Sequence, residues 1–170
     1  MIVRVLKRLY EKAGDFALRD ELGNMICKTA YIGSGYYIYN KRGAQIAQLV
    51  FQKGTAAISV ASSAPSYPGA VNMSITAPDR FIFDVNVIEK GDDQYIKNVK
   101  GRAAKNFSIW GTPSAYAFDI YDGSEKVAEV IPYPQDDDVY QIRTFEKTNL
   151  LYVYMICLAI EKLNAGFGKK

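Results

Sequence analysis

The chain has 170 residues and a net charge of +3, from 21 Lys and Arg against 18 Asp and Glu, a surplus too small to indicate nucleic-acid binding. The sequence contains no histidine, which excludes Ser-His-Asp and Cys-His nucleophile sites, histidine zinc sites and histidine general bases. Hydrophobic residues make up 49% of the chain, so we expect residues 1–170 to form one globular domain with a sizeable core.

The N-terminal segment and the cysteines indicate a cytoplasmic protein. Basic residues interrupt the apolar residues of Met1–Lys12, unlike the continuous apolar stretch of a signal peptide. The two cysteines, Cys27 and Cys157, are too few for a disulfide framework or a four-thiolate zinc site. We therefore expect buried free thiols in a reducing compartment, and no motif in the chain calls for a cofactor or a metal.

Two segments share a strand–turn–strand pattern, Phe16–Cys27 and Tyr36–Ala47. Each turn has an Asx residue followed three positions later by glycine. The side chain of the Asx residue can accept hydrogen bonds from the backbone ahead of it, while the glycine adopts a positive φ. The two pairs are Asp20 with Gly23 and Asn40 with Gly43. This repeat predicts two antiparallel hairpins near the N-terminus.

Further strands follow along the chain, separated by turns. A third hairpin is predicted over Phe118–Val130, with Gly123 in a turn built on Asp-Gly. The connector Ser62–Gly69 is rich in turn residues and lies between two strand-rich halves. Alternation of aromatic or β-branched residues predicts strands over 46–52, 57–61, 71–76, 81–87, 95–100, 107–110 and 139–145.

The last element is a helix, expected over Asn149–Leu163 and ended by a left-handed cap at Gly166. Its run Leu150–Ile160 is apolar or aromatic on every side, but it is shorter than the about 20 residues that span a bilayer. Such a helix is expected to be surrounded by protein. We therefore predict a mainly β fold, a closed antiparallel barrel with this helix inside it. The helix residues expected to pack inside the barrel are Leu151, Met155, Leu158 and Ala159.

These hairpins, the strand Val99–Ile109 and the terminal helix resemble the LURP-one-related family, within the tubby C-terminal-like superfamily that includes the phospholipid scramblases. The resemblance implies a barrel of about twelve strands around a central hydrophobic C-terminal helix. In eukaryotic relatives the fold is similar to a phosphoinositide-binding or lipid-linked module. No run in this chain matches the basic phosphoinositide site of tubby proteins, so that site is not carried over.

A basic cluster is the strongest ligand candidate in the sequence. It consists of Lys97, Lys100, Arg102 and Lys105. If the strand continues unbroken through Gly101, the side chains of Lys100 and Arg102 project from one face toward an anionic headgroup or a phosphate. The alternative is a solvated strand face whose charges protect a sheet edge.

Three other groups of residues have simpler interpretations. Asp136–Asp138 carries the oxygen ligands that Ca²⁺ prefers, but it lacks the spacing of an EF-hand and is interpreted as an exposed acidic turn. Gly33–Gly35 resembles part of a phosphate loop, but it lies between strands with no helix to follow, so we expect a turn. Tyr152 and Tyr154 on the helix need hydrogen-bond partners for their hydroxyls, or else they line a polar cavity.

We expect a non-enzymatic binding module whose ligand is an anionic lipid or a phosphorylated small molecule, with membrane contact that is at most peripheral. The alternative is a protein-interaction scaffold that uses Trp110, Tyr116 or Tyr133 as an anchor. An enzyme based on carboxylate, Tyr or Lys acid–base chemistry is less favoured, because no nucleophile, base and orienting residue come together in the sequence.

Overall fold

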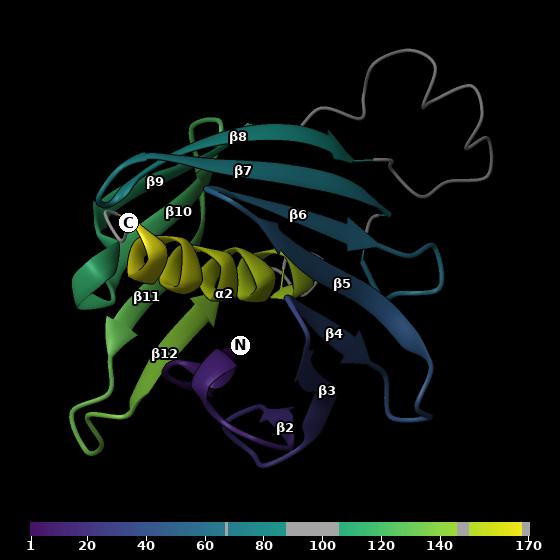
Figure 1. Ribbon diagram of the computed structural model, residues 1–170. Coiled ribbons are helices and arrows are strands. Elements are labelled where there is room, and N and C mark those ends of the chain that lie inside the picture. The colour runs from purple at the N-terminus through teal and green to yellow at the C-terminus, as the bar shows by residue number, and fades with distance from the viewer. Residues whose placement is uncertain (67, 88–105, 146–149, 168–170) are drawn as a thin grey trace.

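The computed structural model describes residues 1–66, 68–87, 106–145 and 150–167, and in them the chain is mainly β with a helix near its C-terminus, as predicted (Figure 1). One antiparallel sheet contains, in spatial order, β1 (Ile2–Leu6), β12 (Val139–Thr144), β11 (Glu125–Pro132), β10 (Ala117–Asp122) and β9 (Phe107–Thr112). The other contains β2 (Asp15–Arg19), β3 (Met25–Ile32), β4 (Gly35–Tyr39), β5 (Gln45–Gln52), β6 (Thr55–Val60), β7 (Gly69–Ala77) and β8 (Arg80–Val87), each paired with the next. Short 3₁₀ turns η1 (Leu9–Glu11) and η2 (Pro113–Ala115) and the helix α2 (Leu150–Gly166) complete the described elements.

The prediction of a closed barrel is wrong, because the described strands form two separate sheets of five and seven strands. Between the edges of β1 and β2 the described backbone pairing is a single bridge, Val3 with Asp20, the residue after β2. A β-bulge between Leu18 and Arg19 lies next to this bridge, and a bulge bends its strand and increases the local twist. No ladder joins β1 to β2 in the described residues. No ladder joins β8 to β9 in the described residues either.

The first two hairpins have the same turn. Oδ1 of Asp20 accepts hydrogen bonds from the backbone amides of Leu22 and Asn24, at 3.0 and 2.9 Å. Oδ1 of Asn40 does the same for the amides two and four residues ahead, both at 2.9 Å. Gly23 and Gly43 both have φ of 85°, which a residue with a Cβ adopts only with strain. The third hairpin has Gly123 at φ 62° in its two-residue loop.

Helix α2 lies between the two sheets and forms the centre of the core (Figure 1). Thirteen of its residues are buried, on every side of the helix. They include the four expected inside, with Leu151 8% exposed and Met155, Leu158 and Ala159 0% exposed. The inward side chains of β1, β4, β6 and β12 pack around the helix as one continuous apolar cluster. The helix is apolar on every side because strands of both sheets pack against it.

Two other expectations are corrected. Gly166 is not a left-handed cap: it belongs to α2, and the Phe167 amide continues the helical pattern by donating to the Leu163 carbonyl at 3.0 Å. The connector Ser62–Gly69, expected between two strand-rich halves, joins the neighbouring strands β6 and β7 of the seven-stranded sheet. The strand predicted over 95–100 lies outside the described residues.

Candidate functional site

The predicted basic cluster of Lys97, Lys100, Arg102 and Lys105 lies outside the described residues. The described part of the chain contains no helix long and apolar enough to cross a membrane. It also contains no group of three or more His, Cys, Asp or Glu residues placed to hold a metal ion.

The other residues singled out from the sequence occupy ordinary structural positions. Asp136 accepts a hydrogen bond from the Asp138 amide at 2.9 Å, so this acidic segment is an exposed turn. Tyr154 is buried, and its hydroxyl is 2.7 Å from the hydroxyl of Thr29. Of the expected anchors, Trp110 is 65% exposed on β9, whereas Tyr133 lies beneath the guanidinium of Arg4.

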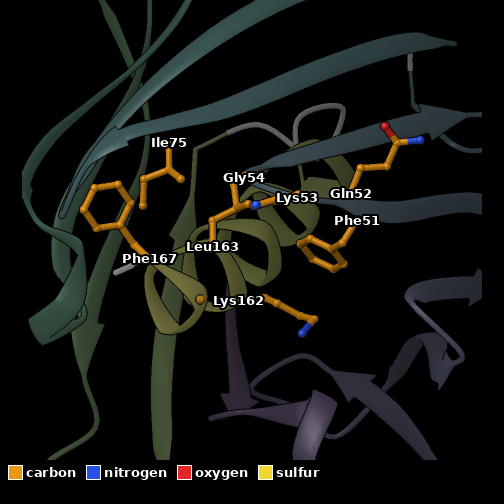
Figure 2. A pocket seen from close by; sticks show the side chains of 9 residues that line it. Phe51, Gln52, Lys53, Gly54, Ile75, Lys162, Leu163 and Phe167 are labelled. Atoms are coloured by element: carbon orange, nitrogen blue, oxygen red, sulfur yellow. The ribbon is translucent and has the colours of Figure 1, made fainter. Parts of the chain in front are cut away.

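The largest cavity described lies at the C-terminal end of α2, and we call it the helix-end pocket (Figure 2). Its volume is about 400 Å³, within the range of small-molecule sites. The turn between β5 and β6, strand β7 and the last turn of α2 form its walls. The lining residues are Phe51, Gln52, Lys53, Gly54, Ile75, Lys162, Leu163, Gly166 and Phe167. Figure 2 shows Phe167 and Ile75 on one side of the helix end, and Phe51 with Lys162 on the other.

The wall of this pocket combines apolar side chains with ammonium groups. Phe51, Ile75 and Leu163 present carbon, and Phe167 is 41% exposed at the mouth. Lys53 is exposed on the turn between β5 and β6, and Lys162 is half-buried on α2. No carboxylate of the described residues forms a salt bridge with either lysine. The pocket therefore has apolar surface and two positive charges that are not neutralised by described neighbours.

The Lys162 ammonium is held by aromatic rings. Its Nζ is 4.8 Å from the ring centroid of Tyr10, 5.6 Å from that of Phe51 and 5.8 Å from that of Tyr31. The rings come from η1, β5 and β3. Tyr10 contacts Tyr31 edge to face at 6.4 Å, and both Tyr31 and Phe51 contact Tyr36, at 4.9 and 6.0 Å. We call Tyr10, Tyr31 and Phe51 the aromatic cage.

A second, smaller cavity of about 250 Å³ lies on the other side of the same helix end. We call it the Glu161 pocket. Glu161 is 8% exposed, and one of its oxygens, Oε2, accepts a hydrogen bond from the Tyr116 hydroxyl at 2.5 Å. The other oxygen, Oε1, is buried and accepts no hydrogen bond from the described residues. The pocket is lined by Arg8, Tyr10, Pro113, Ser114, Tyr116, Glu161, Asn164 and Ala165.

Burial sets the electrostatics of the Glu161 pocket. Desolvation raises the pKa of the Glu161 carboxyl, against the opposing influence of the Tyr116 hydroxyl and of Arg8 and Lys12. The pKa of Tyr116 is raised as well, first by burial and then by its hydrogen bond to Glu161. Tyr116 therefore remains a neutral hydrogen-bond donor at physiological pH.

Asp79 fixes the turn between β7 and β8 against the helix end. Its carboxylate accepts hydrogen bonds from the Ser114 amide and hydroxyl, both at 2.7 Å, and from the Asn164 side chain at 3.2 Å. The Asp79 amide donates to Oδ1 of Asn164 at 3.1 Å, and the backbone of Asp79 is held at φ 63°. This network joins one sheet, η2 and α2, and two of its residues, Ser114 and Asn164, line the Glu161 pocket.

Sequence reasoning missed both pockets. The one signal available was the charged pair Glu161 and Lys162 directly after the apolar run of the helix. A carboxylate at the end of an all-apolar helix is buried if the helix is central, and a buried carboxylate requires partners. Nothing in the spacing of Tyr10, Tyr31 and Phe51 indicates that their rings meet.

Comparisons with known proteins show a likeness of fold. No protein-family model matches the chain, and no curated protein matches it by sequence. The X-ray structure of a protein from Arabidopsis thaliana, AT5G01750, is similar, with a TM-score of 0.59 over 96% of this chain and 90% of that one. The TM-score shows that the two chains share a fold. Because their sequences are only 12% identical, the likeness says nothing about function.

Proposed function

We propose that this protein is a non-enzymatic binding module whose helix-end pocket takes an anionic amphiphile, a molecule with a carboxylate or phosphate head and an alkyl chain. The observation that carries the proposal is the lining of the pocket, which has two ammonium groups without a described carboxylate partner next to four apolar side chains. An anionic lipid is one source of such a ligand. A phosphorylated small molecule with an apolar part is the other.

The two lysines favour an anion at this end of the molecule. The carbonyl end of α2 directs partial negative charge toward the pocket, which by itself would repel an anionic head. Lys53 and Lys162 offset that charge, and ion-paired hydrogen bonds are about twice as strong as neutral ones. The alkyl chain would cover Phe51, Ile75 and Phe167, whose burial adds roughly 25 cal/mol per Å² of apolar surface.

We further propose that the chain belongs to the LURP-one-related family. The three hairpins and the C-terminal helix support this assignment, as does the likeness of fold to the Arabidopsis protein over nearly the whole of both chains. A lipid-linked role for relatives of this fold is consistent with an amphiphile in the helix-end pocket. The location of the protein in the cytoplasm remains part of the same proposal.

Calorimetric titration with octyl phosphate, below the concentration at which it forms micelles, tests the pocket. We expect octyl phosphate to bind at least tenfold more tightly than either octanol or methyl phosphate, because only the first engages both the apolar wall and the lysines. Lys162→Gln should weaken octyl phosphate binding by about tenfold, a loss of ~1.4 kcal/mol, and exposed Lys53→Gln by less.

The matched control is Lys41→Gln, an exposed lysine in the turn at the opposite end of β5. Lys41→Gln removes the same charge from the protein without changing the pocket, so the variant should bind octyl phosphate as tightly as the wild type does. Equal affinities for octyl phosphate and octanol, or equal losses for Lys41→Gln and Lys162→Gln, would contradict the proposal.

A further inference from the structure

The aromatic cage is the most specific cation-binding feature among the described residues. Arg4 and Lys7 each lie over one ring, that of Tyr133 or Tyr116, at 4.5 Å from the centroid. Lys162 alone among the described cations lies within 6 Å of three ring centroids, contributed by η1, β3 and β5. Several rings around one position form the kind of site that proteins use for quaternary ammonium groups.

The cage opens toward both pockets. Phe51 lines the helix-end pocket and Tyr10 lines the Glu161 pocket, while Tyr31 contacts Tyr10 between them. All three rings are half-buried, so part of each remains accessible to a ligand. The carboxylate of Glu161 is close enough to Tyr10 to raise the pKa of its phenol, after the larger effect of burial. This negative charge also favours a cation in the cage.

We propose that the aromatic cage is a binding site for a quaternary ammonium group, and that the Lys162 ammonium occupies it when no ligand is bound. The ligand class is a quaternary ammonium next to a phosphate, as in a choline phospholipid headgroup. This inference rests on the proposed function of the helix-end pocket. When the quaternary ammonium displaces Lys162 from the rings, the lysine stays tethered to the pocket wall and can pair with the phosphate, together with Lys53.

The physical basis is the difference in hydration between the two cations. A primary ammonium has three N–H donors that the rings cannot satisfy, so removing it from water is costly. A quaternary ammonium has no donor and presents methyl groups, which bury apolar surface against the same rings. The exchange therefore returns the Lys162 ammonium to water and phosphate oxygens, where its hydrogen bonds are satisfied.

The test uses the full chain and tetramethylammonium chloride, followed by chemical-shift titration in NMR spectra. Lys162→Met removes the resident cation but keeps an apolar side chain of similar length, and it should bind tetramethylammonium at least tenfold more tightly than the wild type. Adding Tyr31→Leu to Lys162→Met should reverse that gain by about tenfold. Lys41→Met is the charge control and should bind as the wild type does.

Phosphocholine tests the combined site. The wild type should bind phosphocholine at least tenfold more tightly than choline or methyl phosphate, since both halves of the ligand then have partners.

Equal tetramethylammonium affinity in Lys162→Met with and without Tyr31→Leu would overturn the cage. If octyl phosphate still binds in a Lys162-dependent way, the proposed function survives that failure. If tetramethylammonium binds the cage but octyl phosphate does not bind, the proposed function fails and the cage stands.

Discussion

At the scale of single residues, Glu161 is an ionisable side chain buried in the described core. Its carboxyl has a raised pKa, so the folded protein binds this proton more tightly than the unfolded chain does. The free energy of unfolding is therefore highest where the carboxyl is protonated. It falls as the pH rises from the ordinary value of 4.5 through the raised pKa. Glu161→Gln abolishes this titration, and its oxygen can still accept from Tyr116.

We expect Glu161→Gln to have the higher thermal midpoint at pH 7.5, by about 2–4 °C, the effect of ~1 kcal/mol in a domain of this length. The difference should shrink toward pH 4. Glu129 is the opposite case, because its 2.6 Å ion pair with Lys126 lowers the pKa of its carboxyl. That surface pair contributes stability above the ordinary pKa, which is lost as the pH falls. A constant difference between Glu161→Gln and wild type at all pH values would contradict the assignment of Glu161 as a buried, titrating group.

At the scale of elements, the hairpin turns depend on one side-chain oxygen each. Asn40→Ala removes the acceptor of two backbone amides and should lower the free energy of unfolding by about 1 kcal/mol. Asn40→Asp reproduces the turn of the first hairpin, where Asp20 bonds the equivalent amides, and should stay within about 0.5 kcal/mol of the wild type. Urea unfolding measures both. The control is Lys41→Ala in the same turn, and a loss as large as that of Asn40→Ala would mean that the side-chain oxygen has no special role.

Local patterns were enough to predict these hairpins and the helix, because the signals for an Asx turn and for an apolar circumference lie within one element. The relation between the two sheets could not be predicted in this way. Closure of a barrel depends on whether the edge strands of the two sheets form ladders with each other, and the alternation within one strand does not indicate which strand will lie beside it. The end of the helix could not be predicted either, because glycine usually ends a helix, whereas α2 includes Gly166.

The candidate site was less predictable than the fold for a related reason. The three rings of the aromatic cage lie on a 3₁₀ turn and on two strands that are not neighbours in the sheet, so their meeting depends on how α2 is seated. Tyr10, Tyr31 and Phe51 are far apart in sequence, and each alone is typical of a packed aromatic residue. Only the tertiary structure distinguishes a cation site from ordinary core.

At the scale of the whole molecule, the described edges of the two sheets pair in a single bridge, Val3 with Asp20, and both sheets pack on α2. The helix contacts β6 and β7 of one sheet and β12 of the other. Ala159, with no exposed surface, lies in the apolar cluster that both sheets contribute to. A charge at this position would have no partner there, and an unpaired buried charge is among the most destabilising changes known.

Ala159→Asp should therefore abolish soluble, folded protein, whereas Ala165→Lys, on the half-buried last turn of the same helix, should express and melt nearly as the wild type does. Valine gives a measurable version of the same comparison. Ala159→Val overfills a closed space and should lower the free energy of unfolding by about 1–3 kcal/mol, while Ala165→Val should change it by less than about 0.5 kcal/mol. Equal effects of the two valines would mean that Ala159 does not lie in a closed space at the centre of the core.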